Sequence, residues 1–186
     1  MRDLVQKRII AMIPHYTGEG ANFTQVLLMD GEEVLLRKTV NSTLKCLCKF
    51  YHYDLTASNK TCGEMLGVKK TPPIPINSDM VFIAIKTRTP VGKDDGAYSY
   101  INIEMIKEIR ENIIHFKNGN HLKVSCTKKI IEKNIKQAKL LKEMMQTRNT
   151  VIRERESVYR KEIESLREDL ERAYKKLQEI EKTICK

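Results

Sequence analysis

Glycine and proline are confined to the first 119 residues of this chain. All eight glycines and all five prolines lie at or before Gly119, and the 67 residues from Asn120 to Lys186 contain neither. These two residue types are the ones that most often end or break a helix. The stretch that lacks them is rich in Lys, Arg, Glu, Leu and Ile. It therefore predicts a long helical arm that follows a turn-rich globular head.

The head is expected to consist mostly of strands. Extended segments are predicted at Thr24–Met29, Glu33–Leu36, Leu44–Tyr53, Thr71–Pro75, Met80–Ile85 and Tyr98–Ile103 and in a hairpin across Ile113–Cys126, with a polar connection at Asp54–Gly67 and one short helix around Ile103–Ile109. Asp30-Gly31 is a strong signal for a hairpin turn. The apolar run Met80–Ile85 is typical of a buried central strand.

The predicted fold class is α+β, with a mainly antiparallel β head domain followed by a long C-terminal helix or coiled coil. We expect the head at residues 1–126, a basic helix at 127–148 and a coiled-coil dimerisation helix at 149–186. Thr127 is a suitable cap for the first of these helices.

The last hairpin of the head can be paired in more than one way. A two-residue Asn-Gly loop would place Phe116 opposite His121 and would mix apolar and polar side chains on each face. A three-residue loop, Asn118-Gly119-Asn120, would place Phe116 opposite Leu122 and keep the faces distinct. We therefore predict the three-residue loop.

The five cysteines are predicted to be reduced thiols, because no secretory signal is evident. Cys46-x-Cys48, with His52 and Cys62 nearby, admits a zinc site. However, both cysteines of the motif point to one side of the strand predicted at Leu44–Tyr53, and the second pair of ligands that zinc sites usually have is missing. We expect cysteines of the core, with no metal and no cofactor.

The net charge of +10 is unevenly distributed. Residues 1–126 carry 17 Lys and Arg against 13 Asp and Glu, residues 127–148 carry 7 against 2, and residues 149–186 carry 10 against 9. A basic head and a basic first part of the arm suit a polyanionic partner. A charge that only maintains solubility is the alternative, and the lysines of the basic helix equally fit a solvated face.

An apolar heptad repeat occupies the second part of the arm. Its a and d positions are the predicted dimerisation residues Ile163, Leu166, Leu170, Ala173, Leu177, Ile180 and Ile184. On a parallel partner, Glu162 would face Arg167 and Lys176 would face Glu181, so both pairs are opposite in charge. This pattern favours a parallel homodimer over a helix that folds back on its own head.

An ordered series of short motifs runs through the head. The series is Cys48-Lys49-Phe50-Tyr51, Pro72-Pro73-Ile74, Asn77, Met80–Ile85 with Thr87-Arg88-Thr89-Pro90, Tyr100-Ile101 and Ile114-x-Phe116-x-Asn118-Gly119-x-x-Leu122. In this order the motifs resemble the ComK family of competence transcription factors of Gram-positive bacteria, over roughly Asp30–Leu141. The coiled coil from about Arg148 is an addition to the usual plan of that family.

The resemblance implies a multimeric transcription activator that binds A/T-rich promoter DNA, largely through the minor groove, with the transcription machinery as a further partner. Narrow A/T minor grooves attract Arg and Lys side chains without a base-by-base code. The candidate DNA-binding residues are Arg88, Lys93, Lys86, Lys69, Lys70, Lys49, Lys45 and Lys60. The coiled coil would join two heads so that two half-sites are bound together.

Two other functions remain open at this point. One is a protein-interaction adaptor on a coiled-coil scaffold, and the other is a LytTR-like protein that reads the major groove. An enzyme is not expected, because the four histidines form no nucleophile–base pattern and no glycine-rich phosphate loop is present. Since the apolar stretch Ile9–Ile13 is too short for a signal peptide and no run suffices to span a membrane, we expect a cytoplasmic protein.

Overall fold

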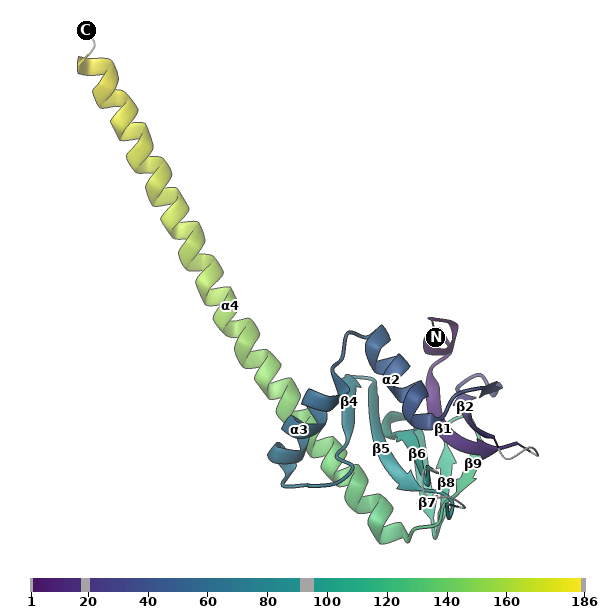
Figure 1. Cartoon of the computed structure of the whole chain (residues 1–186). Helices are drawn as coiled ribbons and strands as arrows, with labels where there is room; N and C mark the ends of the chain where they lie inside the picture. The colour runs from purple at the N-terminus through teal and green to yellow at the C-terminus, as the bar shows by residue number, and fades with distance from the viewer. Residues whose placement is uncertain (1, 18–20, 91–95, 185–186) are drawn as a thin grey trace. The chain divides into compact units, whose positions relative to one another are not determined.

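The computed structural model describes residues 2–17, 21–90 and 96–184 (Figure 1). Within the arm, the side chains of residues 148–158 and 176–184 lie outside this description. Contacts between residues divide the chain into two units, Met1–Lys142 and Glu143–Lys186. In the part of the chain that is described, no helix has the length and apolar character needed to cross a membrane.

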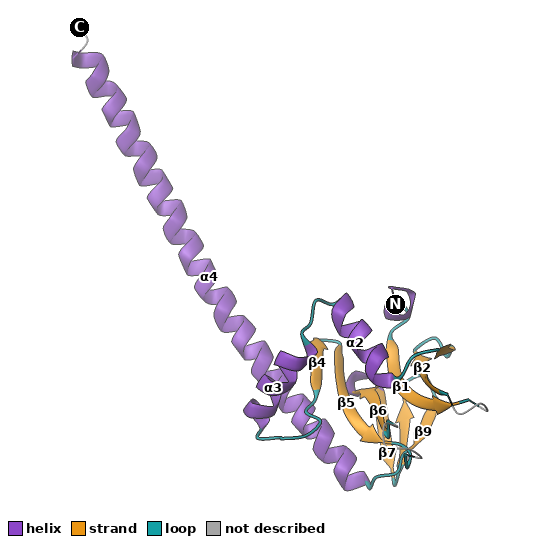
Figure 2. Cartoon of the chain, in the orientation of Figure 1, coloured by secondary structure: helices purple, strands orange, loops and turns teal. Residues whose placement is uncertain are grey.

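The helices and strands give the predicted α+β class, with a mostly antiparallel sheet and a long C-terminal helix (Figure 2). Their order is α1 (Arg2–Gln6), β1 (Ile9–Tyr16), β2 (Asn22–Leu28), β3 (Glu33–Leu36), α2 (Val40–Phe50), α3 (Leu55–Leu66), β4 (Ile74–Asn77), β5 (Met80–Lys86), β6 (Tyr98–Asn102), the 3-10 helix η1 (Ile103–Met105), β7 (Ile106–Arg110), β8 (Ile113–Phe116), β9 (His121–Lys123) and α4 (Lys128–Ile184). The arm is one continuous helix of 57 residues, α4, which begins directly after Thr127 as predicted.

Six strands form one antiparallel sheet in the order β3-β2-β1-β6-β5-β4, and β7, β8 and β9 form a second sheet. The predicted hairpin around Asp30-Gly31 is confirmed, since β2 and β3 pair with Val26 opposite Val34. Gly31 has a φ of +91°, a conformation that favours glycine. The predicted buried strand is also confirmed, because β5 lies between β6 and β4 and all its residues except Lys86 are buried.

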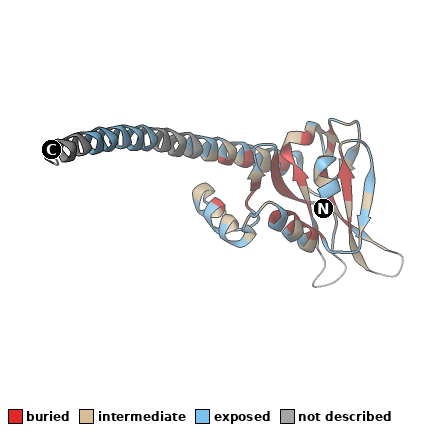
Figure 3. Cartoon of the chain, turned by 90° about the horizontal axis from the view of Figure 1, so that it is seen from above, coloured by how far each residue is buried: buried red, intermediate tan, exposed pale blue. Residues whose placement is uncertain are grey.

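The six-stranded sheet buries apolar side chains on both of its faces (Figure 3). On one face, Met12, Val26 and Phe82 pack against α2 through Val40, Leu44 and Leu47. On the other face, Ile10, Ile83 and Ile101 pack against Ile114 and Phe116 of the second sheet and against Ile131 and Ala138 of α4. The helix α2 and the first part of α4 therefore cover opposite faces of the sheet.

The prediction of a strand at Leu44–Tyr53 is wrong, because this region belongs to α2. The buried side chains of α2 follow a helical period; they are Val40, Thr43, Leu44, Leu47 and Cys48. Cys46, expected beside Cys48 in the core, is only half-buried, and Phe50 is 39% exposed. The alternation of apolar residues fits a strand and a helix equally well over so short a stretch, and the sheet was needed to choose between them.

The polar connection expected at Asp54–Gly67 is also wrong, since it contains the helix α3. Asp54 Oδ1 accepts hydrogen bonds from the backbone N–H groups of Thr56 and Ala57 at 2.8 and 3.0 Å, and Gly67 ends the helix with a φ of +64°. These are standard N-terminal and C-terminal helix signals. They went unrecognised because Cys62 alone among the residues of α3 is buried, so no apolar period accompanies them.

The end of the head differs from expectation in two details. The short helix expected around Ile103–Ile109 is wrong in part, because η1 is followed at once by the strand β7. In the last hairpin Ile114 lies opposite Leu122, and Phe116 N donates to Asn120 O at 2.8 Å. The loop has three residues as predicted, but they are 117–119 and not 118–120. Gly119, with a φ of +91°, takes the last loop position, where this turn type needs a left-handed residue.

Burial of two acidic groups at the α2–α3 corner predicts a loss of stability at high pH. Desolvation by burial raises the pKa of the Cys48 thiol from 9.0 to about 11 and that of the Tyr53 hydroxyl from 10.0 to about 12. Both groups are thus held neutral in the folded state. Their contribution to the free energy of unfolding is complete below pH 9 and is lost as the pH rises through their folded-state pKa values. Urea unfolding should show a falling free energy of unfolding between pH 9 and 12.

Cys48→Ala is the control for this pH dependence, since it removes one of the two groups. The variant should show a shallower decline between pH 9 and 11 than the unmodified chain. Identical slopes for the two proteins above pH 9 would contradict the assignment.

Candidate nucleic-acid interface

One end of the six-stranded sheet brings together residues that are far apart in the sequence. At this end Tyr16 of β1 lies opposite Asn22 of β2, and Lys86 of β5 lies opposite Tyr98 of β6. The helix α2 also begins here. These segments enclose a cavity of about 290 Å³ that is lined by Pro14, Asn22, Thr39, Val40, Asn41, Thr71, Gly96, Tyr98 and Tyr100. We call this cavity and its rim the sheet-end site.

Arg88 supplies a fixed positive charge to the sheet-end site. Its Nε donates to Gly96 O at 2.9 Å and its Nη2 donates to Asn22 Oδ1 at 3.0 Å. The guanidinium carbon lies 3.7 Å from the centre of the Tyr16 ring, in a cation–π contact. Burial lowers the pKa of this guanidinium, which still remains charged at neutral pH. Arg88 therefore joins β1, β2 and the segment before β6.

Three further predicted residues border the same site. Lys86 is exposed and lies opposite Tyr98, while Lys69 and Lys70 are exposed and directly precede Thr71, which lines the cavity. The remaining predicted residues lie elsewhere: Lys45 and Lys49 are exposed on α2, Lys60 is exposed on α3, and Lys93 lies outside the described residues. Four of the eight predicted DNA-binding residues thus bond to, pair with or directly precede residues that line the cavity.

Sequence reasoning missed the segment that leads into α2. Arg37 and Lys38 are exposed and directly precede Thr39, which caps α2 by accepting a hydrogen bond from Ser42 N at 3.3 Å. Thr24 Oγ1 donates to Lys38 O at 2.7 Å, which fixes this segment against the sheet. Two basic residues ahead of a capping threonine were the available signal, and the wrong strand assignment concealed it.

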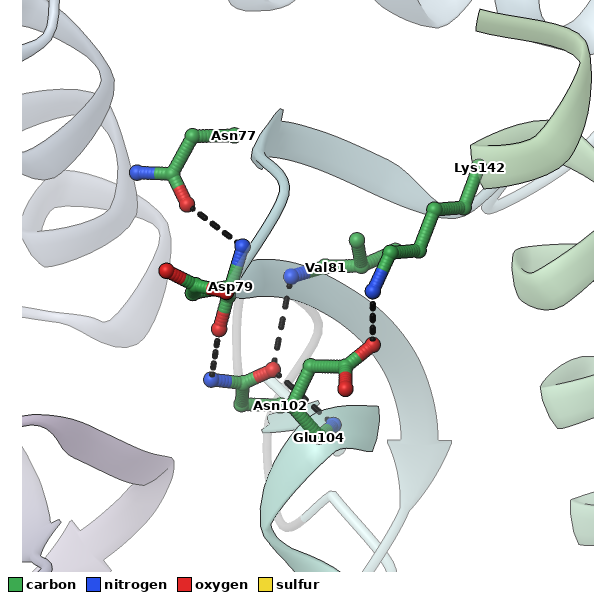
Figure 4. A network of polar contacts seen from close by, with 6 residues as sticks. All are labelled: Asn77, Asp79, Val81, Asn102, Glu104 and Lys142. Atoms are coloured by element: carbon green, nitrogen blue, oxygen red, sulfur yellow. Dashed lines mark hydrogen bonds and ion pairs between the residues drawn. The ribbon is translucent and has the colours of Figure 1, made fainter. Parts of the chain in front are cut away.

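A polar network around Asn102 stabilises the other end of the sheet (Figure 4). Asn102 is 2% exposed, and its Nδ2 donates to Asp79 O at 3.0 Å. Glu104 follows in η1 and forms an ion pair with Lys142 of α4, with an N–O distance of 2.7 Å. Lys142 belongs to the basic helix predicted at 127–148, so one of its lysines is engaged with the head. Lys128, Lys129, Lys133, Lys136 and Lys139 are exposed.

No metal centre is found in the described part of the chain, where no three His, Cys, Asp or Glu residues are grouped suitably to hold an ion. Cys46, Cys48, Cys62 and Cys126 are free thiols. His115 and His121 face each other across β8 and β9 with ring centres 6.0 Å apart.

The predicted dimerisation residues that are described lie on an exposed stripe of the second unit. Ile163, Leu166 and Leu170 are 55%, 67% and 72% exposed, and Ala173 is also exposed. The side chains of Leu177, Ile180 and Ile184 lie outside the described residues. Apolar side chains of this size are thus open to solvent in the single chain.

A family model described as ComK protein matches residues 3–150. The chain belongs to the ComK family. This confirms the resemblance seen in the sequence and places the chain among competence transcription factors, which are not enzymes. The match includes the whole sheet-end site and ends within α4, so most of the second unit lies beyond it. Searches of curated proteins and of solved structures gave no match.

Proposed function

We propose that this ComK-family chain is a cytoplasmic transcription regulator that binds A/T-rich promoter DNA as a dimer, mainly through minor-groove and phosphate contacts. The observation that carries the proposal is the sheet-end site. There Arg88 is bonded to Asn22 and Gly96 of the cavity lining, exposed Lys86 lies opposite Tyr98 of the lining, and exposed Lys69 and Lys70 directly precede Thr71 of the lining. The positive charge of separate segments is thereby concentrated on one small area, as binding to a polyanion requires.

The lysines of the sheet-end site are available to a ligand. Lys69, Lys70 and Lys86 are exposed, and none of them forms an ion pair or hydrogen bond with another described side chain. A/T-rich minor grooves are narrow and strongly negative, so such side chains are drawn into them. The amide of Asn41 and the hydroxyl of Tyr98 add neutral partners for phosphate and sugar oxygens.

The exposed heptad stripe supports a dimer as the binding species. In the first unit, Ile131, Ile135 and Ala138 of α4 are buried or half-buried in the head. Farther along, Leu166 and Leu170 occupy d and a positions of the heptad repeat and are exposed. A second copy of the chain is the proposed occupant, because the g and e charges are complementary in a parallel pair.

Titration of the full chain into short A/T-rich and G/C-rich duplexes at several salt concentrations tests the proposal. We expect tighter binding to the A/T-rich duplex, an affinity that falls linearly on a log–log plot against salt, and competition by minor-groove ligands. Equal affinity for both duplexes or no salt dependence would overturn it. Competition by major-groove ligands alone would favour the LytTR-like alternative.

A further inference from the structure

The net positive charge of the head is confined to one continuous segment. Residues 37–70 contain seven Lys and Arg against two Asp and Glu, a net charge of +5. All other residues of 1–126 contain ten against eleven, a net charge of −1. In the fold, residues 37–70 comprise α2, α3 and the short basic stretches on either side of them. A charge that served only solubility would be spread over the surface, and this one is not.

The exposed sides of α2 and α3 form what we call the helix-pair surface. Lys45 and Lys49 lie on the side of α2 away from its buried residues, and Lys60 is exposed on α3. The helix α2 packs on the face of the sheet that contains Phe82. Lys86 points to the same face, because it is four residues from Phe82 on β5 and side chains alternate along a strand. The helix-pair surface is therefore continuous with the sheet-end site.

The lysines of α4 lie on the opposite side of the sheet. The first part of α4 packs through Ile131 and Ala138 on the face that contains Ile83. Because α2 and the first part of α4 cover opposite faces of the sheet, a duplex that runs along α2 lies on the face away from the lysines of α4. Two lysines of α4 are paired with acids: Lys142 forms an ion pair with Glu104, and Lys128 Nζ lies 3.8 Å from Glu132 Oε1.

The helix α3 is held firmly although it buries little. The turn before it contains His52 with a φ of +52°, and Tyr53 N donates to Cys48 O at 2.9 Å, which fixes the approach from α2. The added Cβ of any other residue at Gly63 would lie 2.7 Å from Val68 O, so close packing defines its end. Exposed Thr56, Lys60 and Thr61 are thus presented in a fixed arrangement, as a recognition surface requires.

We infer that duplex DNA continues from the sheet-end site along the helix-pair surface, with Lys45, Lys49 and Lys60 on its phosphates, and that the lysine face of α4 stays off the DNA. Long, flexible lysine side chains on exposed helix faces suit phosphate contacts, which set the position of a protein on DNA and carry no sequence information. The inference rests on the proposed function and specifies which surface performs it.

Two triple variants with the same change of charge test the inference. The helix-pair variant carries Lys45→Gln, Lys49→Gln and Lys60→Gln, and the matched α4 variant carries Lys129→Gln, Lys133→Gln and Lys136→Gln. All six lysines are exposed. Three lost phosphate contacts per head should reduce the slope of log K against log salt by about 2.7 and lower the affinity at 0.1 M salt by roughly 10²-fold. The α4 variant should keep the slope of the unmodified chain.

The possible outcomes separate the inference from the function on which it rests. If the unmodified chain shows no preference for A/T-rich DNA, the proposed function fails whatever the variants do. The inference is overturned if the unmodified chain shows that preference but the helix-pair variant has the same slope of log K against log salt. It is also overturned if the slope falls equally in both variants. Circular dichroism and thermal unfolding of the variants test whether a smaller slope of log K against log salt comes from loss of the fold.

Discussion

Replacing Asn102 with alanine is expected to lower the free energy of unfolding of the head by about 4 kcal/mol. The side chain is buried and serves four backbone groups at once. Its Nδ2 donates to Asp79 O at 3.0 Å and to Ile9 O at 3.5 Å, and its Oδ1 accepts from Val81 N at 3.3 Å and Glu104 N at 3.2 Å. Each buried backbone group left without a partner costs about 1–3 kcal/mol, part of which relaxation of the structure recovers.

The size of this effect follows from the position of the residue. Asn102 ends β6 and bonds to the turn between β4 and β5 through Asp79 O (Figure 4). It also bonds to the start of β1 through Ile9 O. Typical domains are stable by about 5–15 kcal/mol, so the variant should be only marginally folded. Urea unfolding followed by circular dichroism measures the change.

Asn77→Ala is the matched control for Asn102. Asn77 Oδ1 also accepts a short backbone hydrogen bond, from Asp79 N at 2.9 Å, but Asn77 is exposed and water can replace it. We expect a loss below about 1 kcal/mol for this variant. Losses that agree within 1 kcal/mol for the two asparagines would contradict the role assigned to the buried network.

Replacing Leu166 with lysine is expected to dissociate the proposed dimer. Leu166 occupies a d position, so in a parallel pair two introduced ammonium groups would face each other within the seam. Burial of charge without a partner costs about 3–5 kcal/mol, which corresponds to roughly a 10²- to 10⁴-fold weaker dimer. Sedimentation equilibrium should then show a monomer at concentrations where the unmodified chain is dimeric.

Ser165→Lys is the control, since it adds the same charge one residue earlier at an exposed position outside the seam. It should leave the dimer intact. The loss of the dimer should also weaken binding to DNA with two half-sites by about 10²-fold or more, and leave binding to a single half-site unchanged. A Leu166→Lys chain that remains dimeric would show that the seam does not join the two copies.

Several parts of the fold could be predicted because short-range patterns specify them. The Asp30-Gly31 turn between two apolar runs predicts a hairpin, and the apolar run Met80–Ile85 predicts a strand buried on both faces. The absence of glycine and proline after Gly119 likewise predicts the long helix α4, and the heptad repeat within it predicts a dimer seam. In each case the residues that make the pattern are neighbours in the sequence.

The helices α2 and α3 could not be predicted reliably from such patterns. In α2, the residues Leu44 and Cys48 belong equally to an alternating and to a helical apolar set. Only contact with the sheet selects the helical set, which also contains Val40 and Leu47. In α3, Asp54 and Gly67 were correct signals, but a helix with a single buried residue has almost no apolar period to support them.

The candidate site shows the same limit more strongly. The basic residues and the family could be identified from the sequence, because residue types and short ordered motifs suffice for both. The sequence could not identify which of the basic residues lie at the same end of the fold. Lys86 and Arg88 come to the same end of the sheet only because β1, β6 and β5 pair in that order, and α2 begins beside the cavity at that end.

The sequence by itself thus predicted the long C-terminal helix, the apolar heptad repeat and the resemblance to the ComK family that the family model confirms. Each of these depends on residue order within one stretch of chain. The tertiary structure alone decided that α2 and α4 cover opposite faces of the sheet. It also decided that Arg88 is held by Asn22 and Gly96. The physical reason is that the strand order, and with it the placement of charge, arises from burial shared between distant segments, which no local pattern records.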